Sequence, residues 1–357
     1  MPRLRLIGRN SALCDVILLV SLISLGVVFI IRYADITRRN SEVTSHDKGF
    51  PVESPGIPAD SQRAIEDVLG RVPDSRSAVC RSRKYESLAV ATVLVVFYDY
   101  EFYDAKLTVI SILRDRDLPQ SVTEILLVDD ASSRPQVLKD AQNYIRESDA
   151  MTSHPGVRLV RLPQRLGRIG ARSLAVERHV TSDVVVCVDA GVVCGPGWLA
   201  PLIDLVTSDT DGQTTIAVPH YDHLTHPVTL EYAESSSDLV ATLSWSLTIR
   251  MQRHDTGDKG DALSRTVPVL RGEVFAVRRT FLSSIGGLYD RRLEYGTGAA
   301  EHIDLSLRTW LCGGSIKVRY VVLVDLSFQL QISFLLGQLS LPSPGVGKSS
   351  TGLSGWG

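Results

Sequence analysis

The sequence has little net charge and few cysteines. Its formal net charge is −2 over 357 residues, so it lacks the basic excess that is typical of nucleic-acid-binding proteins, and we expect no nucleic-acid partner. Only five cysteines occur, and none has the CxxC spacing of a zinc site. The chain also has no internal repeat. Its 44% hydrophobic and 22% charged content is that of a globular protein with one large domain or two ordinary ones.

An apolar segment lies close to the N-terminus. About 20 residues in a row, interrupted by Asp15, are apolar, Ser or Gly, which is long enough for a membrane-spanning helix. No small-x-small cleavage site follows, so a retained anchor at 12–33 is favoured over a removed signal peptide or a buried helix. We therefore expect a cytosolic tail at 1–11 and a polar, proline-containing stem at 34–79. Because the candidate chemistry follows the anchor, a single-pass type II orientation is expected.

The middle of the chain alternates between short apolar runs and segments with helical spacing. This pattern predicts an α/β fold with an open, mostly parallel sheet and helices on both faces. A further helix is expected at 303–311, and a disordered Gly/Ser/Pro-rich tail at 326–357. The strands are expected at 91–97, 124–128, 157–162 and 184–188, and the intervening helices at 107–113, 135–147 and 170–179.

Carboxylates follow two of the expected strands. Asp129 and Asp130 come directly after one buried run, and Asp189 ends another. In open α/β sheets, ligands bind beyond the carboxyl ends of the strands. A lone carboxylate there is usually aimed at a metal or a phosphate, because its burial is otherwise unfavourable. We therefore predict a nucleotide-sugar site, in which Asp129 or Asp130 binds uracil or ribose. Helix capping is the alternative for these two residues.

A basic loop that contains glycine precedes the helix expected at 170–179. Its backbone N–H groups, together with Arg165 and Arg172, suit a diphosphate. The loop lacks the Gly-Lys-Ser/Thr ending of a P-loop, and a solvated basic turn is the alternative. Glu301 lies just before another expected helix, where it could orient an acceptor hydroxyl or a sugar, or only favour the helix start electrostatically.

Together these motifs resemble the polypeptide N-acetylgalactosaminyltransferases, Golgi enzymes that start mucin-type O-glycosylation. The resemblance covers roughly residues 80–318, and its longest block runs from Glu301 to Gly314. It implies a GT-A fold in residues 80–325, incomplete at its C-terminal end. It also implies UDP-GalNAc as donor, Mn as cofactor, a Ser/Thr-containing polypeptide as acceptor, and a place in the Golgi membrane.

The resemblance also implies roles for single residues. Asp129 or Asp130 and Arg165 would hold the uridine, and Gly272 would line the sugar pocket. Glu301 would be the glutamate of the family's Gly-Gly-Glu-Asn loop, so it is the candidate catalytic residue.

The sequence departs from the family pattern at the metal site. Asp189 would be the first residue of the family's Asp-x-His motif, but the His position is Gly191. The second metal His would fall near 324–326 and is absent. Mn would therefore keep one expected ligand, Asp189. Cys80 and Cys312 match disulfide-forming positions of the family, and each is expected to lack its partner.

Two functions follow from this comparison. The first is a retaining glycosyltransferase that moves GalNAc from UDP-GalNAc to Ser or Thr of proteins, with activity impaired by the loss of both metal-binding histidines. The alternative is a catalytically inactive GT-A relative that binds a nucleotide sugar or a protein.

Overall fold

The expected anchor at 12–33, the stem at 34–79 and the tail at 326–357 lie outside the residues that the structure describes. None of the helices in the described part is long and apolar enough to cross a membrane. The computed structural model describes residues 81–85, 88–99, 101–151, 155–207, 212–226, 231–233, 239–244, 249–253, 264–290 and 300–325.

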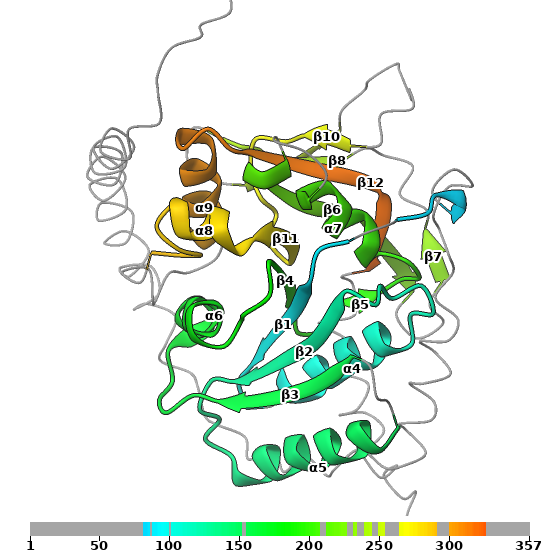
Figure 1. The fold of residues 1–357 in the computed structure, drawn as a ribbon, viewed down its shortest axis with the longest axis vertical. Helices are drawn as coiled ribbons and strands as arrows, with labels where there is room; N and C mark the ends of the chain where they lie inside the picture. The colour runs from blue at the N-terminus through cyan, green and yellow to red at the C-terminus, as the bar shows by residue number, and fades with distance from the viewer. Residues whose placement is uncertain are drawn as a thin grey trace, which may run out of the picture.

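A ten-stranded sheet forms the centre of the described fold (Figure 1). Its strands are β1 (Ala91–Phe97), β2 (Val122–Asp129), β3 (Gly156–Arg161), β4 (Val184–Asp189), β5 (Val193–Cys194), β6 (Thr215–His226), β7 (Glu231–Ala233), β10 (Ser264–Thr266), β11 (Val274–Arg278) and β12 (Ser315–Asp325). The strand order is β10-β12-β6-β11-β4-β1-β2-β3, with β5 paired to β12 and β7 to β6. Strands β1 to β4 pair in parallel, while β11 is antiparallel to both of its neighbours. A separate two-stranded sheet joins β8 (Leu239–Leu243) and β9 (Ile249–Arg253).

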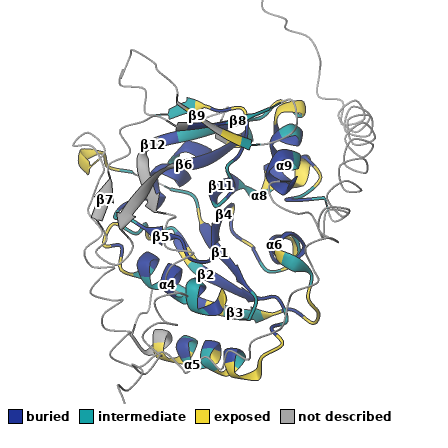
Figure 2. Cartoon of the chain, turned by 180° about the vertical axis from the view of Figure 1, so that it is seen from behind, coloured by how far each residue is buried: buried dark blue, intermediate teal, exposed yellow. Residues whose placement is uncertain are grey.

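Helices pack on both faces of this sheet. Apolar residues of α4 (Glu101–Leu113), α5 (Pro135–Met151) and α7 (Leu199–Thr207) belong to one core cluster. Apolar residues of α6 (Gly167–Arg178), α8 (Arg279–Ser284) and α9 (Ala300–Leu311) belong to the other. A short 3-10 helix, η2 (Gly212–Thr214), precedes β6. Figure 2 shows the central strands buried between these layers. The predicted open, mostly parallel α/β sheet is therefore confirmed.

The central strand β1 shows why these runs are apolar throughout. All seven of its residues are buried. Val95 and Phe97 contribute to the α4/α5/α7 core, whereas Leu94 and Val96 contribute to the α6/α8/α9 core. Successive side chains of a strand point to opposite faces, so a strand covered on both faces needs apolar residues at every position. Each fully buried side chain of this kind stabilises the fold by roughly 1.5–3 kcal/mol.

Some boundaries differ from those expected. The strand β1 begins and ends as predicted, but α6 and α9 each begin three residues earlier than predicted. No strand was expected at 315–325, yet β12 lies there, between β6 and β10. Its place depends on pairing with a segment about 100 residues earlier, which a local apolar pattern does not reveal.

The cysteines also differ in part from expectation. Cys312 is disulfide-bonded, so the prediction that it lacks a partner is wrong. Cys187 and Cys194 are free and buried. Burial raises the pKa of the Cys187 thiol to about 11, so this thiol stays protonated at neutral pH and acts as a small apolar side chain.

Candidate functional site

The carboxylates predicted from the sequence lie at one edge of the sheet. β1 lies between β2 and β4 and pairs in parallel with both. In this register Asp129 at the end of β2 is opposite Phe97, and Asp189 at the end of β4 is opposite Val96. Both acids are therefore at the carboxyl end of the parallel strands, where ligands bind in open α/β sheets.

Asp129 and Asp189 nevertheless face opposite sides of the sheet. Paired residues of neighbouring strands share a face and successive residues alternate, so Asp129 lies on the Phe97 side and Asp189 on the Val96 side. Asp129 is fully buried. Its Oδ1 accepts the backbone N–H of Ser132 at 2.8 Å, and its Oδ2 accepts Arg161 Nη1 at 2.6 Å. The carboxylate of Asp129 thus closes a turn, and its role in uridine binding stays a prediction.

Asp130 lies on the same side as α6. Its two oxygens accept the backbone N–H groups of Leu166 and Gly167, each at 2.8 Å. These amides belong to the start of α6, where N–H groups have no partner within the helix and negative charge is favourable. Burial raises the pKa of the Asp130 carboxyl, while the two amide bonds oppose that rise. A diphosphate at this loop would therefore depend on side chains more than on these two amides.

Arg165 lies at the outer end of the same loop. Its guanidinium carbon is 3.7 Å from the ring centroid of Tyr98, a cation–π contact. Tyr98 follows β1 and is partly exposed. Arg165 also lies close enough to Asp130 to lower the pKa of that carboxyl. The loop therefore presents an aromatic ring, a guanidinium and a carboxylate within a small area.

Asp189 is paired with two arginines of α6. Its Oδ1 accepts Arg172 Nη2, and its Oδ2 accepts Arg168 Nη1 at 3.4 Å. Arg172 is 1% exposed and Asp189 6%, whereas the Arg168 side chain is 48% exposed. Arg168 and Arg172 are four residues apart, so they lie on one face of the helix. Both oxygens of the predicted metal ligand are occupied by cationic groups.

The start of α9 completes this cluster. Glu301 is 1% exposed, and its Oε1 accepts Arg168 Nη2 at 2.7 Å. Arg168 thus bridges the predicted catalytic glutamate and the predicted metal ligand. The neighbouring His302 is also buried. Burial, together with the guanidiniums of Arg172 and Arg168, lowers the pKa of His302 to about 3, so its imidazole is neutral at neutral pH.

Gly272 lies against His302. Its φ is +99°, and a Cβ at this position would overlap the imidazole ring of His302. The loop also reaches the end of β4, because the Asp189 backbone N–H donates to the Glu273 carbonyl at 2.8 Å. Glycine at 272 therefore admits a buried histidine next to Asp189. The contact of Gly272 with a sugar stays a prediction.

The structure thus brings together most of the predicted residues and adds two. Asp189, Arg172, Glu301 and Gly272 surround Arg168 and His302, which were not among the predicted site residues. The spacing of Arg168 and Arg172 was a signal for the first addition. Nothing in the local sequence indicates that His302 packs on Gly272.

The donor set does not fit a divalent metal. Within the described ranges, no group of three or more His, Cys, Asp or Glu side chains is arranged to hold a metal ion. Asp189 and Glu301 are instead ion-paired with arginine, and Gly191 has no side chain to offer as a ligand. Mn prefers several oxygen or nitrogen donors at once, and both carboxylates of this cluster are already ion-paired with arginine.

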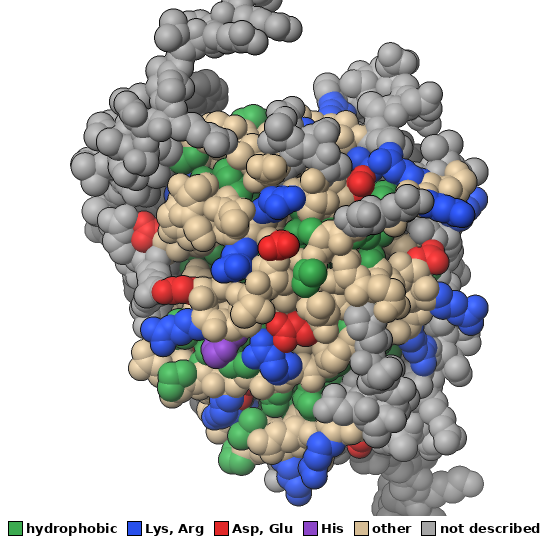
Figure 3. Space-filling view, in the orientation of Figure 1, with side chains coloured by type: hydrophobic (Ala, Val, Ile, Leu, Met, Phe, Trp, Pro, Cys, Tyr) green, Lys and Arg blue, Asp and Glu red, His purple; other side chains and the backbone are tan. Residues whose placement is uncertain are grey.

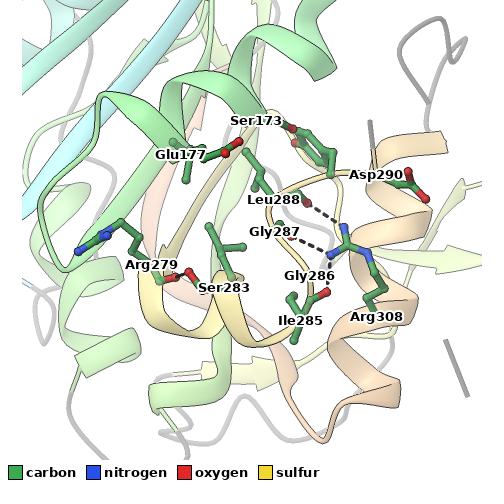
Figure 4. Close-up of a pocket in the computed structure, with 13 residues that line it drawn as sticks. Ser173, Glu177, Arg279, Ser283, Ile285, Gly286, Gly287, Leu288, Asp290 and Arg308 are labelled. Carbon is green, nitrogen blue, oxygen red and sulfur yellow. Dashed lines mark hydrogen bonds between the residues drawn. The ribbon is translucent and has the colours of Figure 1, made fainter. Parts of the chain in front are cut away.

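A separate cavity lies between α6 and the segment that contains α8. It has a volume of about 670 Å³ and is lined by α6, the segment 282–290 and Arg308 of α9 (Figure 4). None of the predicted site residues lines it. The guanidinium of Arg308 is occupied there by the carbonyls of Ile285, Gly287 and Leu288. On the face seen in Figure 3, basic and acidic side chains of the described residues are interspersed.

Known proteins similar to this chain share the fold and the family. Residues 92–285, more than half of the chain, match the family "Glycosyl transferase family 2". The chain is 30% identical to N-acetylgalactosaminyltransferase 6 of Drosophila melanogaster over 69% of this chain and 35% of that protein. It is 33% identical to polypeptide N-acetylgalactosaminyltransferase 15 of Mus musculus over 69% of this chain and 37% of that protein. The chain therefore spans well under half the length of these two relatives.

A solved structure gives the same result for the fold. The crystal structure of GalNAc-T7 with UDP, GalNAc and Mn2+ superposes with a TM-score of 0.63 and 22% identity, over 79% of this chain and 57% of that chain. The likeness supports a GT-A-like fold for the described residues.

Proposed function

Because the chain belongs to glycosyl transferase family 2, we propose that it binds UDP-GalNAc and transfers the sugar to Ser or Thr of polypeptides. The names of its relatives support N-acetylgalactosamine as the sugar and a polypeptide as the acceptor. The relatives are more than twice as long as the part that matches this chain. The donor, the acceptor and the transfer are therefore argued from the residues of the site.

The observation that carries the proposal is the gathering of charged groups at the carboxyl edge of the sheet. Arg165 and the Tyr98 ring lie close to the buried Asp130, where they suit a uridine. Arg168 and Arg172 lie beside Asp189. A diphosphate needs cationic donors of this kind.

The residues around Asp189 suit the chemical step. When UDP departs, negative charge develops on its diphosphate, and fixed cationic donors stabilise that charge. Arg168 and Arg172 supply such donors. Glu301 is buried next to them, and its Oε2 makes no hydrogen bond with any residue in the described part. That oxygen is available to orient an acceptor hydroxyl or a sugar hydroxyl.

The proposed location is the Golgi membrane, with residues 12–33 as a type II anchor. The apolar N-terminal segment and the Golgi family that the sequence resembles support it. Fluorescence microscopy of the full chain with a C-terminal tag should show overlap with a Golgi marker. Loss of this overlap after deletion of residues 12–33 would support the anchor, whereas an unchanged pattern would contradict it.

The activity is tested by incubating the full chain with UDP-GalNAc and a Ser/Thr-containing peptide. UDP release and a peptide mass increase of one GalNAc are expected. Glu301→Gln should slow transfer at least tenfold with little change in UDP affinity, because the lost carboxylate acts on the transferred group. Glu147→Gln, an exposed change on α5, is the matched control. Absence of both UDP binding and transfer would contradict the proposal.

A second function is favoured by one observation. Asp189 and Glu301 are both ion-paired with Arg168, which holds the catalytic candidates in a closed charge network. A catalytically inactive member that binds a nucleotide sugar or a protein would keep such a network. This function predicts UDP binding without UDP-GalNAc hydrolysis or transfer.

A further inference from the structure

We propose that Arg168 and Arg172 take the place of a divalent metal ion, so that the chain binds the diphosphate of a nucleotide sugar without metal. The inference rests on the proposed function and specifies how its binding site works. Its basis is the mismatch between the metal site implied by the resemblance and the side chains that lie there.

The carboxylate of Asp189 is already occupied by cationic side chains. Each of its carboxylate oxygens already accepts a guanidinium N–H, one from Arg172 and one from Arg168. Arg172 and Asp189 are both more than nine-tenths buried. A metal ion at this carboxylate would have to displace a buried cation or lie next to it. Like charges repel strongly where water is excluded, so metal binding is disfavoured.

The two arginines together carry the charge of a divalent metal ion. A Mn²⁺ ion carries two positive charges, and Arg168 and Arg172 together carry two positive charges next to the same carboxylate. A guanidinium is always protonated, and it binds phosphate oxygens with two parallel N–H donors. The pair therefore matches the charge of the ion and adds directional hydrogen bonds, while Asp189 and Glu301 hold both guanidiniums in place.

Arg172 has N–H groups that its ion pair with Asp189 does not use. Within the described part of the chain, Nε and Nη1 of Arg172 make no hydrogen bond, although both atoms are fully buried. Tyr289 lies beside Arg172, whose charge and side-chain contact oppose the rise that burial causes in the pKa of the Tyr289 hydroxyl. Nδ1 of the adjacent His302 also has no partner among these residues. Buried polar groups are nearly always satisfied, and an anionic ligand would satisfy those of Arg172.

Arg168 is the member of the cluster that a ligand can reach from solvent. Its side chain is about half exposed, while Arg172 is enclosed. Arg168 also contacts both Asp189 and Glu301. A diphosphate that approaches from solvent meets Arg168 first and can exchange with these carboxylates. Arg168 is therefore the residue to change, because its replacement leaves the buried Arg172–Asp189 pair in place.

The first experiment measures UDP binding to the full chain by calorimetry, in EDTA and in excess Mn. Equal Kd values within about twofold are expected. Binding that is at least tenfold tighter with Mn would overturn the inference and leave the proposed function standing. Absence of UDP binding in both conditions would overturn the proposed function and this inference with it.

The second experiment compares two variants in EDTA. Arg168→Gln should weaken UDP binding by about tenfold, since it removes a charge-assisted contact. Arg158→Gln is the matched control, because Arg158 is also ion-paired and its side chain is 43% exposed. It should leave the Kd unchanged. Equal affinity of the Arg168→Gln variant and the unmodified chain would overturn the inference. Thermal unfolding of both variants confirms that they are folded.

Discussion

The imidazole of His302 occupies the space in which a side chain on Gly272 would begin. The contact links the loop before β11 to the first turn of α9, next to the Arg172–Asp189 ion pair. The packing of two segments about 30 residues apart in the sequence thus depends on the absence of a Cβ at Gly272.

We expect Gly272→Ala to lower the free energy of unfolding by about 2–4 kcal/mol, since it combines overpacking with strain at a positive φ. Urea denaturation measures the change. Gly287→Ala is a close control, because Gly287 also has a φ of +99° but no atom within 4 Å of an added Cβ. It should lower stability by only about 1 kcal/mol. Equal losses in the two variants would show that His302 does not fill the space beside Gly272.

The buried ion pair predicts a second stability effect. Among the described residues, Arg172→Met leaves Asp189 with only the half-exposed Arg168 as a cationic partner. Removing one member of a buried pair typically destabilises a protein by about 3–5 kcal/mol, and a loss of this size is expected in urea denaturation. Arg158→Met breaks an exposed pair with Glu124 and should change stability by about 1 kcal/mol or less. A loss for Arg172→Met as small as that of the control would contradict burial of the pair.

The neutral state of His302 predicts a pH effect. Its pKa of about 3 in the folded protein lies below the unfolded value of about 6.5, so acid favours the unfolded chain. The stability contribution is complete above pH 6.5 and is lost as the pH falls toward 3, with a slope of up to about 1.4 kcal/mol per pH unit. Urea denaturation from pH 7 to pH 4 should therefore show a shallower decline for His302→Gln than for the unmodified chain. Parallel declines would contradict a buried, neutral His302.

Asp104 on α4 predicts an effect of the opposite sign. Burial, with a smaller effect from Glu101, raises the pKa of this carboxyl to about 6, above the unfolded value of about 3.8. The charged carboxylate is therefore unfavourable in the folded state at pH 7, and stability is regained as the pH falls from about 6 to about 4. Asp104→Asn should raise the free energy of unfolding by about 1–2 kcal/mol at pH 7. The gain should disappear near pH 4, and its persistence there would contradict the raised pKa.

The local pattern of residues was enough to predict the layers of this protein. The continuous apolar runs at 91–97 and 184–188 indicated strands buried on both faces, and helical spacing between such runs indicated a parallel sheet. The same pattern put Asp129, Asp130 and Asp189 at one edge, because the carboxyl ends of parallel strands meet there.

The tertiary structure alone decided which of these acids share a site. A strand turns successive side chains to opposite faces, so a difference of one residue in register separates Asp129 from Asp189. The partners of Asp189 come from α6, and the glutamate that shares Arg168 comes from α9, 133 residues farther along the chain. Sequence spacing does not reveal such long-range contacts. Only the folded chain therefore shows that cationic side chains occupy the expected metal position.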